Sequence, residues 1–67
     1  MAISPKAARV NAGLTQTEAA KSLGISKGTL ANYEKYRTSP DVIMAEKIAA
    51  LYQMSVNDII FVPSNCA

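Results

Sequence analysis

The sequence contains no histidine and only one cysteine, Cys66, among its 67 residues. A single cysteine cannot form an internal disulfide, and without histidine the chain lacks the usual set of zinc ligands. Histidine is also the commonest general base, and the carboxylates are scattered along the chain. We therefore expect a protein from a reducing compartment that is not an enzyme, holds no metal or cofactor and takes no small-molecule ligand.

Long apolar segments are missing as well. Runs such as IIFV at residues 59–62 are far shorter than the roughly 20 apolar residues that a membrane-spanning helix needs. The N-terminal stretch MAISPKAARV has no long apolar run after its positive charges, so it does not have the pattern of a signal peptide. These absences predict a soluble cytoplasmic protein that has no membrane partner.

Charge is present but unevenly distributed. Residues 1–40 carry six basic and two acidic side chains, for a net charge of +4, whereas residues 41–67 carry one basic and three acidic side chains, for a net charge of −2. This asymmetry predicts one basic face that can meet a polyanion. A solvated helix surface of mixed charge would give the same counts, so charge alone leaves both interpretations open.

Helix start and stop signals divide the chain into five short segments. Ser4 followed by Pro5, Thr15 followed three residues later by Glu18, and Ser26 are typical of helix N-caps. Gly13 and Gly24 are typical of left-handed helix stops. Together with openings at residues 41 and 55, these signals predict helices over residues 5–11, 16–23, 27–35, 41–53 and 56–61. We expect one compact all-α domain over residues 1–67, with residues 61–67 as a C-terminal tail.

Apolar residues at helical spacing are expected to form the core of this domain. They are Ile3, Ala7, Val10, Ala20, Leu23, Ile25, Leu30, Tyr33, Ala45, Ile48, Ala49, Tyr52, Met54, Val56, Ile59 and Ile60.

Residues 16–35 have the features of a helix-turn-helix motif. Ala20 leaves room for a second helix to cross closely, and Gly24 can take the positive φ of a tight turn. In such a motif the second helix enters the major groove of DNA. The whole stretch GLTQTEAAKSLGISKGTLANYEKYRTSP, residues 13–40, resembles the Cro/C1-type helix-turn-helix family of phage repressors and bacterial regulators. The resemblance extends over residues 6–60 and implies a five-helix, lambda-repressor-like fold.

Two positions depart from the family pattern. Ala19 stands where the family usually has leucine, and Tyr36 stands where it usually has glycine. A left-handed backbone at Tyr36 would be strained, because a Cβ atom disfavours positive φ. We consider two interpretations of Tyr36: its hydroxyl reaches a DNA phosphate, or its ring is partly buried in the loop between the third and fourth helices.

The resemblance implies which residues contact DNA. In relatives the glutamine at the start of the second helix holds a phosphate, and the first turns of the third helix face base edges. Lysine can donate to guanine, asparagine can pair with adenine, and a threonine methyl can meet that of thymine. The residues after the third helix suit phosphates. The candidates are Gln16, Ser26, Lys27, Gly28, Thr29, Asn32, Lys35, Tyr36, Arg37 and Thr38.

Gly28 is unusual among these candidates. It lies in the first turn of the third helix, where glycine costs about 1 kcal/mol relative to alanine. We expect that the missing side chain allows a closer approach to DNA. For each of the other candidates, an ordinary solvated or capping role remains the alternative interpretation.

The resemblance also implies a structural ion pair and a dimer surface. Arg9 and Glu34 match a pair that relatives use as a structural ion pair between the first and third helices. Related domains also bind two-fold operators as dimers, and the apolar residues Ile59, Phe61 and Val62 are candidates for a dimer surface. The alternative is that these three side chains fold back over the core.

These features predict a sequence-specific double-stranded DNA-binding regulator, a small phage-type repressor resembling Cro, acting as a homodimer in a prokaryotic or phage-infected cell. The alternative is a protein-interaction module of the same fold, such as an antitoxin or antirepressor.

Overall fold

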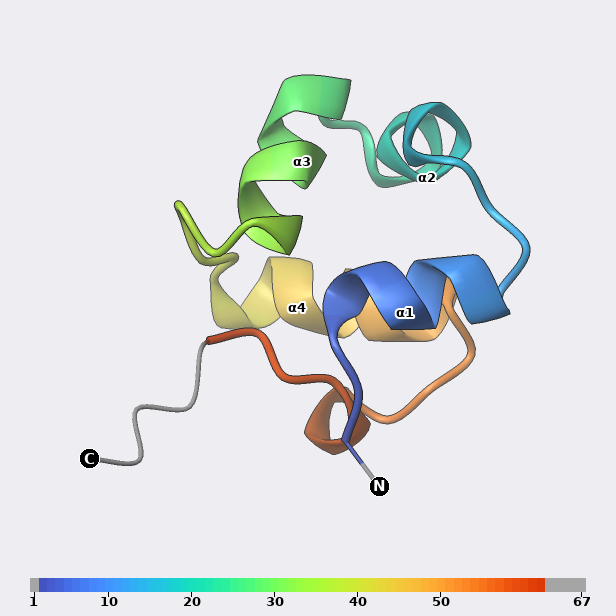
Figure 1. Ribbon diagram of the computed structural model, residues 1–67, viewed down its shortest axis with the longest axis vertical. Helices are drawn as coiled ribbons and strands as arrows, with labels where there is room; N and C mark the ends of the chain where they lie inside the picture. Colours follow the sequence, from blue (N-terminus) through green and yellow to red (C-terminus); the bar gives the residue numbers. More distant parts are fainter. Residues whose placement is uncertain (1, 63–67) are drawn as a thin grey trace.

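The computed structural model describes residues 2–62. In this part of the chain four α-helices are joined by short turns: α1 (Pro5–Asn11), α2 (Gln16–Leu23), α3 (Lys27–Glu34) and α4 (Val42–Leu51). A single 3-10 turn, η1 (Val56–Asp58), follows α4. Helix α2 packs against α3 and α4, α1 packs against α3, and η1 packs against α4. Figure 1 shows α2 and α3 together at one end of the molecule, with η1 at the other.

Each α-helix begins at a side chain that accepts a hydrogen bond from the backbone three residues later, as at Ser4, Ser26 and Asp41. At α2 the capping box is complete. The Glu18 N–H donates to Thr15 Oγ1 over 3.1 Å, and the Thr15 N–H donates to Glu18 Oε1 over 2.9 Å. Hydrogen bonding to the Glu18 carboxyl, first by the Thr15 backbone N–H and second by the Thr15 side chain, lowers the pKa of Glu18 below its ordinary value of 4.5.

A left-handed residue lies one or two positions beyond the end of every α-helix. The four are Gly13 (φ 76°), Gly24 (φ 73°), Tyr36 (φ 61°) and Gln53 (φ 57°). In each case the next N–H reaches back to the helix; after α3, for example, the Arg37 N–H donates to the Asn32 carbonyl over 2.9 Å. Gly13 and Gly24 therefore act as the predicted stops, while Tyr36 and Gln53 adopt the same conformation with a Cβ atom.

The core is small and contains many alanines. Its buried cluster consists of Ala8, Ala19, Ala20, Leu30, Ile48, Ala49, Tyr52 and Ile59. Ala19 and Ala20 are 0% and 2% exposed, so at these two positions α2 offers only methyl groups to the elements that pack on it, while Leu23 at its end packs against the core. Val10, predicted as a core residue, is instead 58% exposed, because the adjacent Ala8 and Arg9 face inward on the short α1.

The fifth helix predicted over residues 56–61 is wrong. Only η1 is helical, and at Ile59 the backbone is extended (φ −118°, ψ 129°). The extended residues pair with the start of the chain: the Ile3 N–H donates to the Asp58 carbonyl over 2.9 Å, and the Ile60 N–H donates to the Ile3 carbonyl over 2.8 Å. This long-range pairing replaces the hydrogen bonds that a helix would have made.

The extended backbone also changes which side chains are buried. Ile59 is 5% exposed, Ile60 is 37% exposed, Phe61 packs against the core, and Val62 is 57% exposed. This inward and outward alternation is that of a strand. Ile60 is therefore not a core residue, and Ile59 is not a dimer contact. Val56, in η1, is 36% exposed and is not a core residue either. Pro63 and Cys66, in the predicted tail, lie outside the described residues.

Candidate nucleic-acid interface

The first turn of α3 is exposed at the end of the molecule that α2 and α3 form (Figure 1). Ser26 caps it, accepting from the Thr29 N–H over 3.1 Å, and the hydroxyl groups of Ser26 and Thr29 lie 2.8 Å apart. The Thr29 hydroxyl is thus engaged with the cap. Lys27 and Gly28 are exposed to solvent.

Nothing in residues 2–62 requires glycine at position 28. Its φ is not positive, and a Cβ atom there would meet only Ser26 Oγ, at 3.9 Å. That distance is ordinary van der Waals contact. The cost of glycine in this helix therefore has no explanation in packing or backbone geometry, which keeps the close-approach hypothesis open.

The remaining α3 candidates lie further along the helix and beyond it. Asn32 is partly buried, one turn after Gly28. Lys35, Arg37 and Thr38 are exposed where the chain leaves α3. The structure thus presents polar candidates at both ends of α3, with the cations Lys35 and Arg37 grouped at its C-terminal end.

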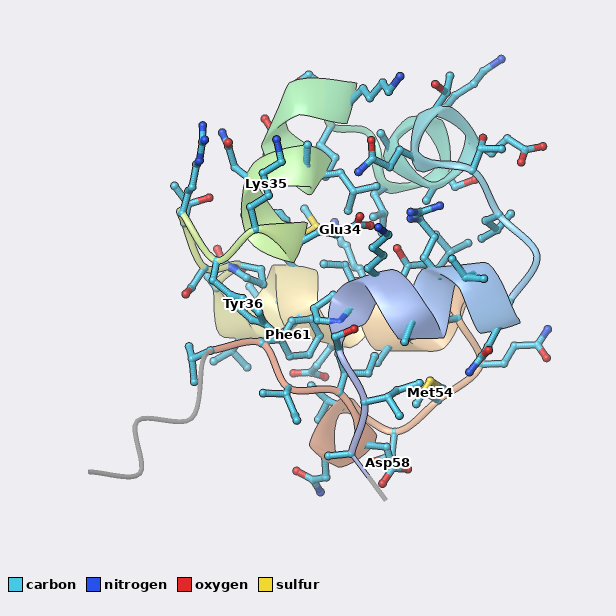
Figure 2. All side chains as sticks on the ribbon, in the orientation of Figure 1. Glu34, Lys35, Tyr36, Met54, Asp58 and Phe61 are labelled. Atoms are coloured by element: carbon cyan, nitrogen blue, oxygen red, sulfur yellow. The ribbon has the colours of Figure 1, made fainter. Side chains whose placement is uncertain are left out.

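Arg9 and Glu34 lie together in a hydrogen-bonded network between α1, α2 and α3. Arg9 Nε donates to Glu34 Oε2 over 2.7 Å, and the two side chains are 10% and 4% exposed. Arg9 Nη1 also donates to the Leu14 carbonyl over 2.8 Å. In Figure 2 the Glu34 side chain points into the space between α3 and α1.

Gln16 belongs to the same network, which sequence reasoning did not anticipate. Its Nε2 donates to Glu34 Oε1 over 2.9 Å. An amide nitrogen carries two hydrogens, so one remains for a second acceptor. Glu34 therefore fixes Gln16 at the first turn of α2, where the backbone N–H groups have no partner within the helix.

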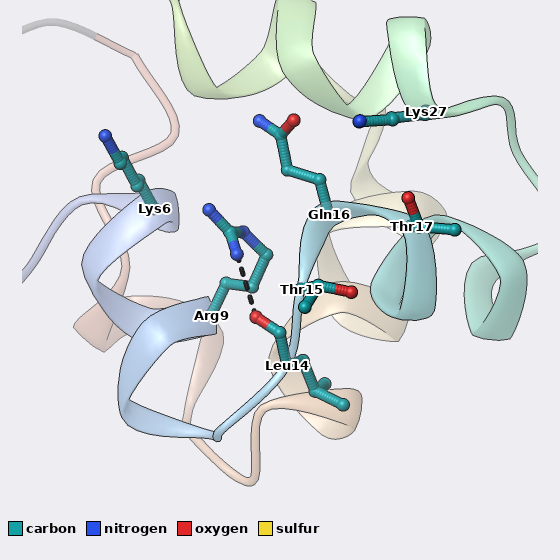
Figure 3. Close-up of a pocket in the computed structure, with 7 residues that line it drawn as sticks. All are labelled: Lys6, Arg9, Leu14, Thr15, Gln16, Thr17 and Lys27. Atoms are coloured by element: carbon teal, nitrogen blue, oxygen red, sulfur yellow. Dashed lines mark hydrogen bonds between the residues drawn. The ribbon is translucent and has the colours of Figure 1, made fainter.

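An open groove of about 440 Å³ lies beside this network, lined by Lys6, Arg9, Leu14, Thr15, Gln16, Thr17 and Lys27. Figure 3 shows Lys6, Gln16 and Lys27 reaching over it from α1, α2 and α3. Two lysines, an amide and a helix N-terminus suit an anion such as a phosphate. Within residues 2–62, no group of three or more His, Cys, Asp or Glu side chains is placed to hold a metal.

The Tyr36 side chain turns toward the C-terminal part of the chain. Its hydroxyl donates to the Ile60 carbonyl over 2.9 Å, and its ring is partly buried. A phosphate oxygen only accepts hydrogen bonds, and the single hydroxyl hydrogen is already donated. The structure therefore corrects the hypothesis of a phosphate-bound Tyr36 in favour of the partly buried ring.

Tyr52 contributes an unusual buried group beside the ion pair. Its side chain is 4% exposed, and its hydroxyl has no hydrogen-bond partner among the described residues. Burial, followed by the nearby negative charge of Glu34, raises the pKa of Tyr52 to about 12. The phenol is therefore neutral at pH 7, and none of the residues that the structure describes forms a hydrogen bond with it. The sequence contained no signal for this, because Tyr52 has the spacing of an ordinary core residue, directly after the end of α4.

Comparison with known proteins explains this architecture. The helix-turn-helix family model matches residues 6–59 of the chain. The chain belongs to the helix-turn-helix family. The resemblance to Cro/C1-type proteins seen in the sequence is thereby confirmed, and the turn between α2 and α3 is the turn of the helix-turn-helix motif.

Two relatives carry regulator names. The chain is 42% identical over 52 residues to the HTH-type transcriptional regulator ImmR of Bacillus subtilis (strain 168), covering 78% of this chain and 41% of that protein. It is also 42% identical over 52 residues to an uncharacterized HTH-type transcriptional regulator of Methanothermobacter thermautotrophicus, covering 76% of this chain and 75% of that protein. The chain thus spans less than half the length of the Bacillus regulator. No solved structure matches the chain. None of the helices described here is long and apolar enough to cross a membrane.

Proposed function

We propose that this protein is a sequence-specific, double-stranded DNA-binding transcriptional regulator that inserts α3 into the major groove. The observation that carries the proposal is the exposed first turn of α3, with Lys27 and Gly28, next to the cationic groove at the start of α2. Lys27 donates to guanine O6 or N7, and Asn32 reads an adenine in this proposal. Gln16 and Lys6 hold one phosphate, and Lys35, Arg37 and Thr38 hold others.

The same proposal includes a two-fold operator and a homodimer. We propose a repressor of the phage type, resembling Cro, in which residues 1–67 form one DNA-binding domain and which acts in the cytoplasm on the nucleoid. Half-sites would lie about 34 Å apart, one turn of DNA. Val62, which is 57% exposed, remains the best candidate for a subunit contact, since Ile59 is buried and Phe61 packs against its own core.

Selection of duplexes from a random-sequence library tests the proposal directly. The full chain should enrich a two-fold sequence, and log Kd for that duplex should rise steeply with log salt, with a slope of about +0.9 for each phosphate contact. Lys27→Ala should weaken the selected duplex by about 5- to 150-fold and relax the preference at one position. Lys47→Ala, an exposed lysine on α4, is the matched control and should change binding little.

Gly28→Leu tests the close-approach hypothesis. A Cβ atom at this exposed position makes only ordinary contact with Ser26 Oγ, and leucine favours a helix more than glycine, so thermal stability should be unchanged or higher. Binding to the selected duplex should nevertheless weaken. A variant that binds as tightly as the wild type would show that glycine is merely tolerated at this position.

A protein-interaction module of the same fold is the second candidate. Val42 and Ile43, at the start of α4, are 74% and 69% exposed, and such apolar side chains suit a protein partner. In that case no duplex should be enriched, and residual DNA binding should show no sequence preference.

A further inference from the structure

Tyr36 lies two positions beyond the end of α3 and determines how the chain leaves that helix. Tyr36 has φ 61°, a left-handed conformation that residues with a Cβ atom rarely adopt and that glycine adopts readily. Helix α4 ends in the same way at Gln53 (φ 57°), but there the side chain is exposed. A strained residue persists when its surroundings hold it, so the Tyr36 side chain is the place to look for what holds it.

That side chain joins α3 to the C-terminal segment, defined here as residues 58–62. The Tyr36 hydroxyl donates to the Ile60 carbonyl over 2.9 Å, and Figure 2 shows the Tyr36 ring on the side of α3 nearest Phe61. The hydrogen bond spans 24 positions of the sequence. It is therefore a tertiary contact between the end of α3 and a segment far along the chain.

The acceptor of this bond is itself fixed. The Ile60 N–H donates to the Ile3 carbonyl over 2.8 Å, and the Ile3 N–H donates to the Asp58 carbonyl over 2.9 Å. Between these bonds Ile59 is 5% exposed in the core. The Ile60 carbonyl therefore offers Tyr36 an anchored point rather than a free end.

The donor, in turn, controls the path of the chain after α3. The Tyr36 N–H donates to the Tyr33 carbonyl over 3.2 Å, and the Arg37 N–H donates to the Asn32 carbonyl over 2.9 Å. The dihedral angles of Tyr36 thus set the direction in which Arg37 and Thr38 leave the helix. Both side chains are exposed there.

We propose that Tyr36 is a positioning residue that couples the C-terminal segment to the DNA-backbone contacts made just after α3. This inference rests on the proposed DNA-binding function. An anchored Tyr36 holds Arg37 and Thr38 in the geometry that phosphates require, whereas a glycine at this position would leave the loop free to sample others. Because coupling is reciprocal, DNA binding should also stabilise the C-terminal segment.

Tyr36→Phe removes only the hydroxyl and is the first test. On the tightest duplex selected by the wild-type chain, binding should weaken by about 3- to 10-fold, as for the loss of one net hydrogen bond. If one phosphate contact is lost with it, the salt slope should fall in magnitude by about 1. Affinities are measured well below the melting temperature, where both proteins are folded, so that a loss of stability alone cannot change them.

Hydrogen exchange at the Ile60 amide separates positioning from direct contact. In the free protein, Tyr36→Phe should speed exchange at Ile60 while leaving Leu30 in the core unchanged. Adding the selected duplex should protect Ile60 in the wild type and not in Tyr36→Phe. A hydroxyl that simply touched a phosphate would leave Ile60 exchange in the free variant the same as in the wild type, which would overturn the proposal.

Tyr36→Gly and Gln53→Gly form a matched pair, since each relieves a left-handed residue. Tyr36→Gly should weaken DNA binding at least as much as Tyr36→Phe, whereas Gln53→Gly should leave it unchanged. If wild type binds a duplex and both Tyr36 variants bind it within about 1.5-fold, the coupling is wrong while the proposed function stands. If wild type selects no duplex, the proposed function is wrong and this inference falls with it.

Discussion

Replacing Glu34 with alanine is expected to remove much of the stability of the fold. Glu34 accepts from Arg9 Nε over 2.7 Å and from Gln16 Nε2 over 2.9 Å, and its side chain is only 4% exposed. The variant leaves a guanidinium and an amide with little water to replace the lost acceptor. Removing one partner of a buried pair costs about 3–5 kcal/mol.

This cost is large for a chain of 67 residues. At 0.05–0.15 kcal/mol per residue, the free energy of unfolding of such a chain is about 3–10 kcal/mol. A loss of 3 kcal/mol should lower the melting temperature by at least about 12 °C, since each kcal/mol shifts a domain of this size by 4–8 °C. Urea unfolding followed by circular dichroism at 222 nm gives the free energy independently.

Two variants sharpen the result. Glu46→Ala removes an exposed glutamate on α4 and should change the free energy of unfolding by no more than about 0.5 kcal/mol. Arg9→Met combined with Glu34→Leu removes both charges and should be more stable than Glu34→Ala, because no unpaired charge remains. A Glu34→Ala protein within about 1 kcal/mol of Glu46→Ala would refute the reasoning that the pair is buried and interdependent.

Three further substitutions probe single features. Gln53→Gly relieves the left-handed residue after α4 (φ 57°) and should raise the free energy of unfolding by about 1 kcal/mol in urea titrations; no gain would mean that the exposed Gln53 side chain compensates. Tyr52→Phe removes a buried hydroxyl that has no hydrogen-bond partner in residues 2–62 and should stabilise the fold by about 1 kcal/mol at pH 7. Because the folded pKa of Tyr52 is raised from 10.0 to about 12, wild-type stability should fall as the pH rises through that window, and the advantage of Tyr52→Phe should widen there; a constant advantage would contradict the shift. Thr15→Val removes the side-chain acceptor at the start of α2 and should lower the free energy of unfolding by about 1 kcal/mol in urea titrations. Because hydrogen bonding, first by the Thr15 backbone N–H, lowers the pKa of Glu18, the stability that the ionised Glu18 carboxyl contributes should be present above pH 4.5 and be lost on acidification below it, as unfolding of the wild type at pH 3 and pH 6 would reveal.

The starts of the helices could be predicted from the sequence because their causes are local. Ser4, Thr15 and Ser26 each bond to a backbone N–H three residues away, so cap and helix are read from the same short stretch. The stops were predictable only where glycine marks them. Tyr36 was anticipated as strained if left-handed, but Gln53 carries no comparable signal.

The C-terminal segment could not be predicted because its partner lies at the other end of the chain. Ser55 and Asp58 have the spacing of a helix cap, yet Ser55 Oγ accepts only from the Asn57 N–H, at 3.3 Å, and the helix stops after one 3-10 turn. Because this segment pairs with Ile3 in an extended conformation, successive side chains face inward and outward in turn, and Ile60 faces outward.

In the candidate site, too, some features could be predicted from the sequence, whereas others depend on contacts between residues far apart in the chain. The resemblance brought together Arg9 and Glu34, and the structure adds Gln16 to them through a hydrogen bond across 18 positions. The charge count indicated a basic region but not its location. The groove between Lys6 and Lys27 required the packing of α1 against α3, which no local pattern encodes.

The pairing of Ile3 with Ile59 has a consequence for the order of folding. It closes a loop of 56 positions, whereas α2 and α3 are joined by a turn of three residues. The entropy lost on closing a loop grows with its length, so the helical hairpin should form early and the two ends of the chain should meet late. Tyr36 can find the Ile60 carbonyl only after that closure. The exit of α3 therefore acquires its final geometry in the last step of folding, and it is the first part of the motif to lose that geometry when the ends separate.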